Sequence, residues 1–141
     1  LALRATLSPR GVARLEVGAG AEAAPLRGLA AALAGELAEY FAGRRTRFSV
    51  PVDLTACSPF QRRVLEACAR VPAGSTTTYA ALARDAGCAG AARAVGTALA
   101  RNPVLILVPC HRVLRADGGL GGFLAGPEWK RRLLALEGVV A

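Results

Sequence analysis

The chain has 141 residues, enough for one compact domain or for a small lobe joined to a larger one. Its formal net charge is +8, and all but one of its 18 basic residues are arginine. This balance favours a polyanionic partner, because arginine forms charge-assisted bonds to phosphate; an arginine-rich genome or a thermophile's surface would give the same balance. No apolar stretch is long enough to span a bilayer and no secretory leader is recognisable, so we expect an intracellular protein without a membrane partner.

The four cysteines are widely spaced and form no C-x-x-C pair. With a single histidine in the chain, this spacing gives no recognisable metal site, and we expect neither a metal ion nor another cofactor. Disulfides are not expected either, because the chain is apolar enough to bury a core without them. We interpret Cys57, Cys68 and Cys88 as small packing residues.

The N-terminal third predicts a small α/β lobe, residues 1–53, with a short antiparallel sheet. Apolar and polar residues alternate through residues 1–17 around a turn, which indicates a β-hairpin. Leucines at helical spacing from Leu26 onward predict a helix that ends near residue 41. Residues 47–52 predict a third strand, placed at a sheet edge because it contains a proline.

Residues 54–141 predict a mostly helical second domain, so the expected fold class is α+β. A capping box, Ser58-Pro59-Phe60-Gln61, begins the first helix. Two short helices follow over residues 79–86 and 91–101, and a last helix begins at Pro127 and ends at Glu137. The middle pair has the pattern of a helix-turn-helix, although helical hairpins also occur in any α-rich core.

The second helix of that pair has an unusual composition. Gly96 lies in its interior, and small residues that include Ala92 surround a lone Arg93. Glycine inside a helix costs about 1 kcal/mol relative to alanine, so a close approach of another backbone is the expected compensation. That approach would suit a nucleic-acid groove with Arg93 projecting into it. Close packing against another helix, with a solvated arginine, fits equally well.

The only histidine of the chain, His111, directly follows Cys110. A neighbouring imidazole, or the charge of Arg112, lowers the pKa of a thiol and produces the thiolate that attacks electrophiles. The alternative is an inert buried cysteine at the end of an apolar strand over residues 104–108. Adjacent side chains on an extended chain point to opposite sides, so a direct bond between Cys110 and His111 would be awkward.

The chain resembles the O6-alkylguanine-DNA alkyltransferases, also called methylated-DNA–protein-cysteine methyltransferases, over about residues 37–138. The resemblance rests on motifs that keep the family's order and spacing. These are Phe60-Gln61, residues 71–76, Tyr79, Leu82-Ala83, residues 93–96, Asn102-Pro103, residues 109–113, Gly121-Gly122, Leu133-Leu134 and Glu137.

Members of this family repair DNA directly by moving an alkyl group from guanine O6 in duplex DNA to their own cysteine, once per molecule, with thymine O4 as a further candidate position. The resemblance implies that Cys110 is the acceptor. It implies that His111 activates Cys110 through a water molecule and is oriented by Glu137. Tyr79 would then face the leaving base, and Asn102 would tie the second helix to the turn of the nucleophile.

The resemblance also implies where the substrate lies. The carbonyl of Val113 and the amide near Leu124 would bracket the edge of the base, next to Phe123. Phe123 stands where many members have tyrosine, and Leu124 replaces a smaller or polar residue, so the pocket departs from the family pattern at two positions.

For DNA, the resemblance implies that a monomer binds the minor groove of double-stranded DNA and flips the damaged nucleotide out. Arg93 would fill the vacated space, and Ala92 and Gly96 would let the helix approach the groove. The expected location is the cytoplasm, in association with the nucleoid of a prokaryote. Competing hypotheses are an alkylated-DNA binding protein without chemistry, a Cys-His thiol hydrolase and a helix-turn-helix regulator.

Overall fold

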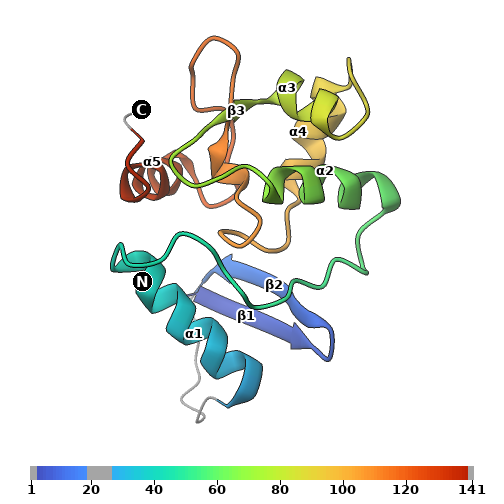
Figure 1. The fold of residues 1–141 in the computed structure, drawn as a ribbon. Helices are drawn as coiled ribbons and strands as arrows, with labels where there is room; N and C mark the ends of the chain where they lie inside the picture. Colours follow the sequence, from blue (N-terminus) through green and yellow to red (C-terminus); the bar gives the residue numbers. More distant parts are fainter. Residues whose placement is uncertain (1–2, 19–26, 140–141) are drawn as a thin grey trace.

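A computed structural model describes residues 3–18 and 27–139 of the chain. Figure 1 shows a hairpin and one helix (blue to cyan) on one side and four further helices (green to red) on the other. The expected α+β class is confirmed. Leu26 and most of the Gly/Ala-rich segment before it lie outside the described residues.

The hairpin is confirmed as an antiparallel pair of strands, β1 (Leu3–Ser8) and β2 (Gly11–Val17). The register shifts between Thr6 and Leu7, so the alternation of β2 is interrupted by a bulge. Helix α1 (Gly28–Phe41) packs beside the hairpin and buries Leu33, Glu36 and Tyr40.

The third strand predicted over residues 47–52 is wrong. The segment makes only an isolated bridge, between Val12 and Val52. Two of its backbone amides bond to a buried side chain instead of to a strand. The Glu36 carboxylate accepts hydrogen bonds from the amides of Ser49 and Val50 at 2.9 and 3.3 Å. Pro51 has no amide hydrogen to donate, so a second strand ladder cannot form there.

The four C-terminal helices are confirmed. They are α2 (Pro59–Ala69), α3 (Tyr79–Asp85), α4 (Ala92–Ala100) and α5 (Pro127–Leu136). Side chains cap two of them. Ser58 Oγ, the cap predicted from the sequence, accepts from the Gln61 amide at 3.1 Å, and Thr78 Oγ1 accepts from the Ala81 amide at 3.1 Å. Each cap satisfies a backbone donor that the first helical turn leaves free.

Helices α3 and α4 are joined by a tight turn in which Gly87 and Gly90 have positive φ angles of 80° and 87°. The helix pair expected from the sequence is therefore present. Helix α4 is also tied to α2, since Gln61 Nε2 donates to the carbonyls of Ala98 and Arg101 at the end of α4. These bonds fix the position of α4 within the domain.

The apolar run at residues 104–108 is not a strand, which corrects the extended chain assumed before Cys110. It forms a tight turn in which Ile106 has a φ of 73°, and Cys110–Arg112 continues as a 3-10 turn, η1. The chain becomes extended only at β4 (Val113–Leu114), which pairs in parallel with β3 (Thr77–Thr78). Two-residue strands carry no periodicity, so the sequence could not reveal this pair.

The two lobes share backbone hydrogen bonds. The Leu15 amide donates to the Pro103 carbonyl at 2.8 Å, and the Leu105 amide donates to the Leu15 carbonyl at 3.0 Å. The turn that precedes Cys110 is thus anchored on the hairpin as well as on α4. Within residues 3–18 and 27–139, no helix has the length and apolar character needed to cross a bilayer.

We predict that Gly11→Ala lowers the free energy of unfolding by about 2 kcal/mol. Gly11 has a φ of 142°, and a Cβ atom there would lie 2.4 Å from the Pro51 carbonyl oxygen. Urea unfolding measures the loss. Gly43→Ala is the matched control, because Gly43 also has a positive φ (77°) but no atom within 4 Å of the added carbon. Equal losses in the two variants would contradict the contact with Pro51.

Candidate functional site

Asn102 builds the turn that presents the cysteine. Its side chain is buried, and Nδ2 donates to the Val108 carbonyl at 3.0 Å and to Cys110 Sγ at 3.2 Å. Its Oδ1 atom accepts from the Val104 amide at 3.0 Å. A single side chain therefore closes both ends of the turn and also contacts the sulfur, as expected of the residue that ties α4 to the nucleophile's turn.

Cys110 lies in the wall of a cavity of about 570 Å³. The volume is in the range of small-molecule sites. The cavity is lined by residues from α3, α4, η1 and the glycine-rich loop before α5: Tyr79, Gly96, Leu99, Ala100, Cys110, Arg115, Gly121, Gly122, Phe123 and Leu124. Several predicted site residues thus meet around one space.

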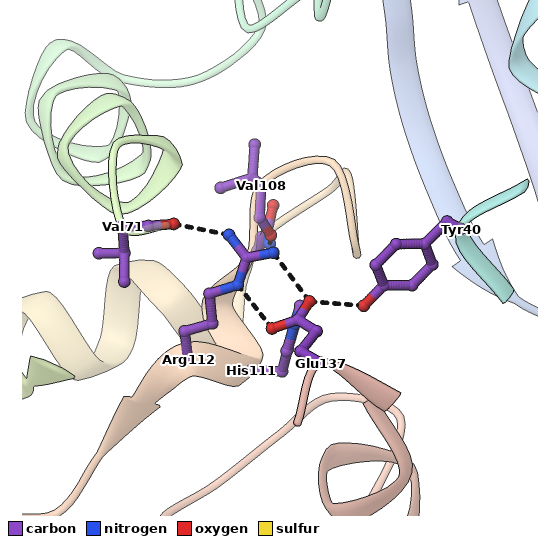
Figure 2. A network of polar contacts seen from close by, with 7 residues as sticks. Tyr40, Val71, Val108, His111, Arg112 and Glu137 are labelled. Atoms are coloured by element: carbon purple, nitrogen blue, oxygen red, sulfur yellow. Dashed lines mark hydrogen bonds and ion pairs between the residues drawn. The ribbon is translucent and has the colours of Figure 1, made fainter. Parts of the chain in front are cut away.

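His111 is fully buried behind this wall and contacts Glu137, which follows the last residue of α5. The distance from His111 Nε2 to Glu137 Oε2 is 2.8 Å. Arg112 forms a bidentate ion pair with the same carboxylate, with Nε and Nη2 each 2.8 Å from an oxygen, and its Nη1 donates to the Val71 carbonyl at 2.6 Å (Figure 2). Tyr40 donates its hydroxyl to Glu137 Oε2 at 2.6 Å.

The ionisation of Glu137 fixes the tautomer of His111. Burial raises the pKa of the carboxyl group, but the hydrogen bonds from Arg112, His111 and Tyr40 outweigh it and bring the pKa to about 2. An ionised carboxylate only accepts hydrogen bonds, so Nε2 of a neutral His111 carries the hydrogen. Burial also lowers the pKa of His111, which keeps the ring neutral near pH 7. Its Nδ1 atom is buried without a partner among the described residues and is free to accept a proton.

The Cys110 thiol is protonated in this arrangement. Burial raises its pKa above the ordinary value, and the Asn102 hydrogen bond and the charge of Lys130 offset this only in part. The adjacent Arg112 does not activate the sulfur, as the sequence suggested it could, because its guanidinium group is directed at Glu137 and Val71. Deprotonation of Cys110 therefore needs a base.

Lys130, the only lysine of the chain, is fully buried in α5. Its Nζ atom donates to the carbonyls of Val113 and Gly122 at 2.7 and 3.1 Å. Burial lowers its pKa to about 8, while the neighbouring Cys110 and Cys68 act in the opposite direction. The Val113 carbonyl, which is expected to face the guanine base, therefore already accepts a hydrogen bond from Lys130. One of its two lone pairs is left for a ligand.

Tyr79, at the start of α3, packs its hydroxyl group against the glycine-rich loop. A Cβ atom on Gly121 would be 2.6 Å from the Tyr79 hydroxyl, and one on Gly96 would be 3.8 Å from its ring. Gly96 therefore lines the same cavity as Tyr79, and an added Cβ atom there would be at an ordinary van der Waals distance from the ring.

The remaining cavity residues lie at its mouth. Phe123 is half-buried, and its ring meets that of His111 edge-on, with the centroids 6.4 Å apart. Leu124 is 61% exposed, although it is a large apolar side chain. Arg115, which sequence reasoning missed, is exposed and pairs with Asp117 at 3.2 Å. The mouth therefore combines apolar surface with a cation.

Arg93 projects into solvent from the first turn of α4, and Ala92 beside it is half-buried. Neither residue lines the cavity. Arg93 precedes the cavity residues Gly96 and Ala100 by three and seven positions, so it lies on the same face of α4, about one turn or more nearer the N-terminus.

Three buried residues, Tyr40, Arg112 and Lys130, were not identified as site residues from the sequence. Tyr40 lies 97 positions from Glu137, so no local pattern connects them. Arg112 was considered only as a charge beside the thiol. Lys130 carried one signal, being the only lysine among the basic residues, but its burial depends on packing. Among the described residues, no cluster of three or more His, Cys, Asp or Glu side chains could hold a metal ion.

A family model described as 6-O-methylguanine DNA methyltransferase, DNA binding domain, matches residues 59–139. The chain belongs to this family. The methyltransferase match contains Cys110, His111, Glu137, Asn102 and Tyr79, but not Tyr40.

Methylated-DNA–protein-cysteine methyltransferase of Mycolicibacterium paratuberculosis is 49% identical over 102 residues, which are 72% of this chain and 61% of that protein. The aligned region thus spans less than two thirds of that methyltransferase. Among solved structures, Mycobacterium tuberculosis OGT in complex with DNA has a TM-score of 0.81 and 38% identity, with 96% of this chain and 91% of that chain covered.

A third similar protein is S. pombe Atl1, solved with damaged DNA that contains O6-carboxymethylguanine. It has a TM-score of 0.53 and 32% identity, and the match covers 57% of this chain and 77% of that one.

We predict that Lys130 makes the stability of the protein rise with pH between about 8 and 10.5. The unfolded chain keeps the lysine proton up to its ordinary pKa of 10.5, whereas the folded chain loses it near 8. In this window the unfolded state binds more protons, so the free energy of unfolding increases with pH. Urea unfolding of the wild type and of Lys130→Met across this range should give curves that diverge as pH rises. Parallel curves would contradict a buried, titrating lysine.

Proposed function

We propose that this chain repairs alkylated DNA by transferring an alkyl group from guanine O6 to Cys110, once per molecule and without a cofactor. The observation that carries the proposal is the position of the Cys110 sulfur, which lies in the wall of a cavity with Tyr79 while the His111–Glu137 pair lies behind it. A nucleophile, a base and an orienting carboxylate are the components that activate a weak nucleophile.

The transfer begins with the thiol proton. Glu137 holds the hydrogen of His111 on Nε2, so the proton of Cys110 passes to Nδ1. No hydrogen bond joins the sulfur and the imidazole in the described part of the chain, so a water molecule between them relays the proton, as the family resemblance implies. The thiolate then attacks the alkyl carbon: the carbon–sulfur bond forms and the bond to guanine O6 breaks.

The electron pair of the broken bond passes to the guanine, which needs stabilisation as charge develops. The Tyr79 hydroxyl is available for this role, since burial raises its pKa and keeps it protonated as a donor. The Val113 carbonyl, held in place by Lys130, accepts from the base edge, and Phe123 and Leu124 flank the entrance. The alkyl group stays on sulfur, so each molecule reacts once.

A guanine stacked in a duplex cannot reach Cys110, so the nucleotide must leave the stack. We assign this step to α4, which lies in the minor groove with Ala92 near the backbone and Arg93 in the space left by the flipped base. The exposed Arg93 and the high positive charge of the chain support a phosphate-rich partner. Binding is by a monomer, in the compartment that holds the chromosome.

An alkylated-DNA binding protein without chemistry is the second candidate, favoured by the similarity to Atl1. The presence of Cys110 with its hydrogen-bonded surroundings favours transfer. Incubation with a duplex carrying O6-methylguanine with a labelled methyl group separates the two, because label appears on the protein only if transfer occurs. Repeated hydrolysis of a small ester without DNA would instead indicate a thiol hydrolase.

We predict that Cys110→Ala abolishes transfer of the label while binding to the alkylated duplex persists. The substitution removes the accepting sulfur but leaves Tyr79 and α4 in place. Mass spectrometry of the protein after reaction measures the transfer, and a gel-shift assay measures binding. Cys88→Ala is the control and should react like the wild type, because Cys88 does not line the cavity. Label on Cys57, Cys68 or Cys88 would contradict the assignment.

We predict that Arg93→Ala slows repair of duplex DNA roughly tenfold but leaves the reaction with free O6-methylguanine base unchanged. The arginine acts only when a stacked nucleotide must be replaced. Single-turnover rates with the two substrates measure the difference. Arg131→Ala is the matched control, since it removes the same charge from the exposed surface of α5. Equal losses on duplex and free base would contradict the role of Arg93.

A further inference from the structure

Tyr40 connects the N-terminal lobe to the proposed reaction site. It lies in the last turn of α1, is 2% exposed, and packs its ring against Phe41 and Phe48, with centroids 5.3 and 5.4 Å away. These contacts hold the ring firmly. Its hydroxyl group reaches Glu137 at 2.6 Å, and Figure 2 shows it approaching the carboxylate from the side opposite Arg112.

Glu137 needs every donor that surrounds it. Its side chain is 1% exposed and stands at the C-terminal end of α5, where the helix dipole disfavours a negative charge. A carboxylate has about four lone-pair positions. Four donors reach it: Arg112 Nε contacts Oε1, and Arg112 Nη2, His111 Nε2 and the Tyr40 hydroxyl all contact Oε2. Tyr40 is the donor that reaches the carboxylate from outside the region matched by the family model.

We propose that Tyr40 is a positioning residue of the alkyl-transfer site. Its hydroxyl group fixes the Glu137 carboxylate and weakens the attraction of that carboxylate for a proton on His111. The proposal rests on the proposed function for its consequence in repair, but not for the physical coupling between Tyr40 and His111. It gives the N-terminal lobe a part in the chemistry of the C-terminal domain.

The coupling runs through one oxygen atom. Glu137 Oε2 accepts from Tyr40, His111 and Arg112 Nη2, so the Tyr40 hydroxyl competes with the other two donors for its electron density. The charged groups that face His111 are Glu137 and Lys130 from α5 and its end and Arg112 from η1; the Phe123 ring beside it is uncharged. Glu137 favours the imidazolium, and the two cations oppose it. Loss of the Tyr40 hydroxyl leaves more of the carboxylate's charge to His111.

The test uses the fact that His111 is the only histidine of the chain. In a ¹⁵N-labelled protein, the imidazole NMR signals report its tautomer and its titration without ambiguity. We expect the wild type to show hydrogen on Nε2 and a pKa below the ordinary value. In Tyr40→Phe, which keeps the ring and removes only the hydroxyl, the pKa of His111 should rise.

Ser49→Ala is the matched control. It also removes one hydroxyl that donates to a buried carboxylate of the N-terminal lobe, Glu36, but that pair does not contact His111. Urea unfolding shows whether the two variants lose similar stability. A rise in the pKa of His111 in Tyr40→Phe alone supports the proposal. An unchanged or lowered pKa, or equal shifts in both variants, would overturn it even if Tyr40→Phe unfolds more easily.

The consequence for repair is measured separately. In Tyr40→Phe we expect single-turnover transfer from O6-methylguanine DNA to slow roughly tenfold, because the orientation of His111 loosens. The loss should be larger in mildly acidic than in mildly alkaline buffer: a higher pKa leaves less of the neutral imidazole as base at low pH. DNA binding should not change. If the wild type transfers no label, the proposed function fails, while the NMR titration still decides whether Tyr40 controls His111.

Discussion

The buried carboxylate of Glu137 is the constraint on which the site depends. A carboxylate at the end of a helix, shielded from water, is unstable unless donors surround it, and its donors come from α1 and η1. Once they are in place, the carboxylate is ionised, His111 must carry its hydrogen on Nε2, and Nδ1 is left as the proton acceptor. The chemistry available to Cys110 follows from how one negative charge is accommodated.

Burial gives the thiol of Cys110 two properties at once. Its raised pKa keeps it protonated and unreactive in the absence of a base, which would suit the single transfer proposed for it. The same burial strengthens the influence of nearby groups, because charges interact more strongly away from water. Asn102, which donates to the sulfur, and the charge of Lys130 therefore act on Cys110 more strongly than they would in water.

The elements that the sequence predicted correctly are those with local causes. Helix α2 begins at a serine cap and α3 at a threonine cap, and both signals lie within four residues of what they control. The failures occur where a buried side chain bonds to the backbone of a later segment. The Glu36 carboxylate accepts from the amides of Ser49 and Val50 in the segment at 47–52, and Asn102 closes the run at 104–108 into a turn. These bonds depend on burial of the side chain, which the sequence pattern does not show.

The site shows the same division. The resemblance located Cys110, His111 and Glu137, and the structure brings the last two into contact. It could not locate Tyr40, because a hydrogen bond between positions 97 apart leaves no mark in a single sequence. Nor could it show that Gly96, expected to let α4 approach DNA, also lines the cavity that contains Cys110 and Tyr79.

The buried charges of this site also bear on how the two lobes work together. Replacing a buried ion pair by apolar residues often leaves stability unchanged or higher, so Arg112 and Glu137 are weak evidence for a purely structural role. Their geometry is better explained by the orientation of His111, and the Tyr40 hydroxyl extends that geometry into the N-terminal lobe. The boundary expected near residue 53 would separate the elements of the chain, but the hydrogen bond between Tyr40 and Glu137 crosses it. In our proposal, the N-terminal lobe thereby supplies a donor to the carboxylate that orients His111.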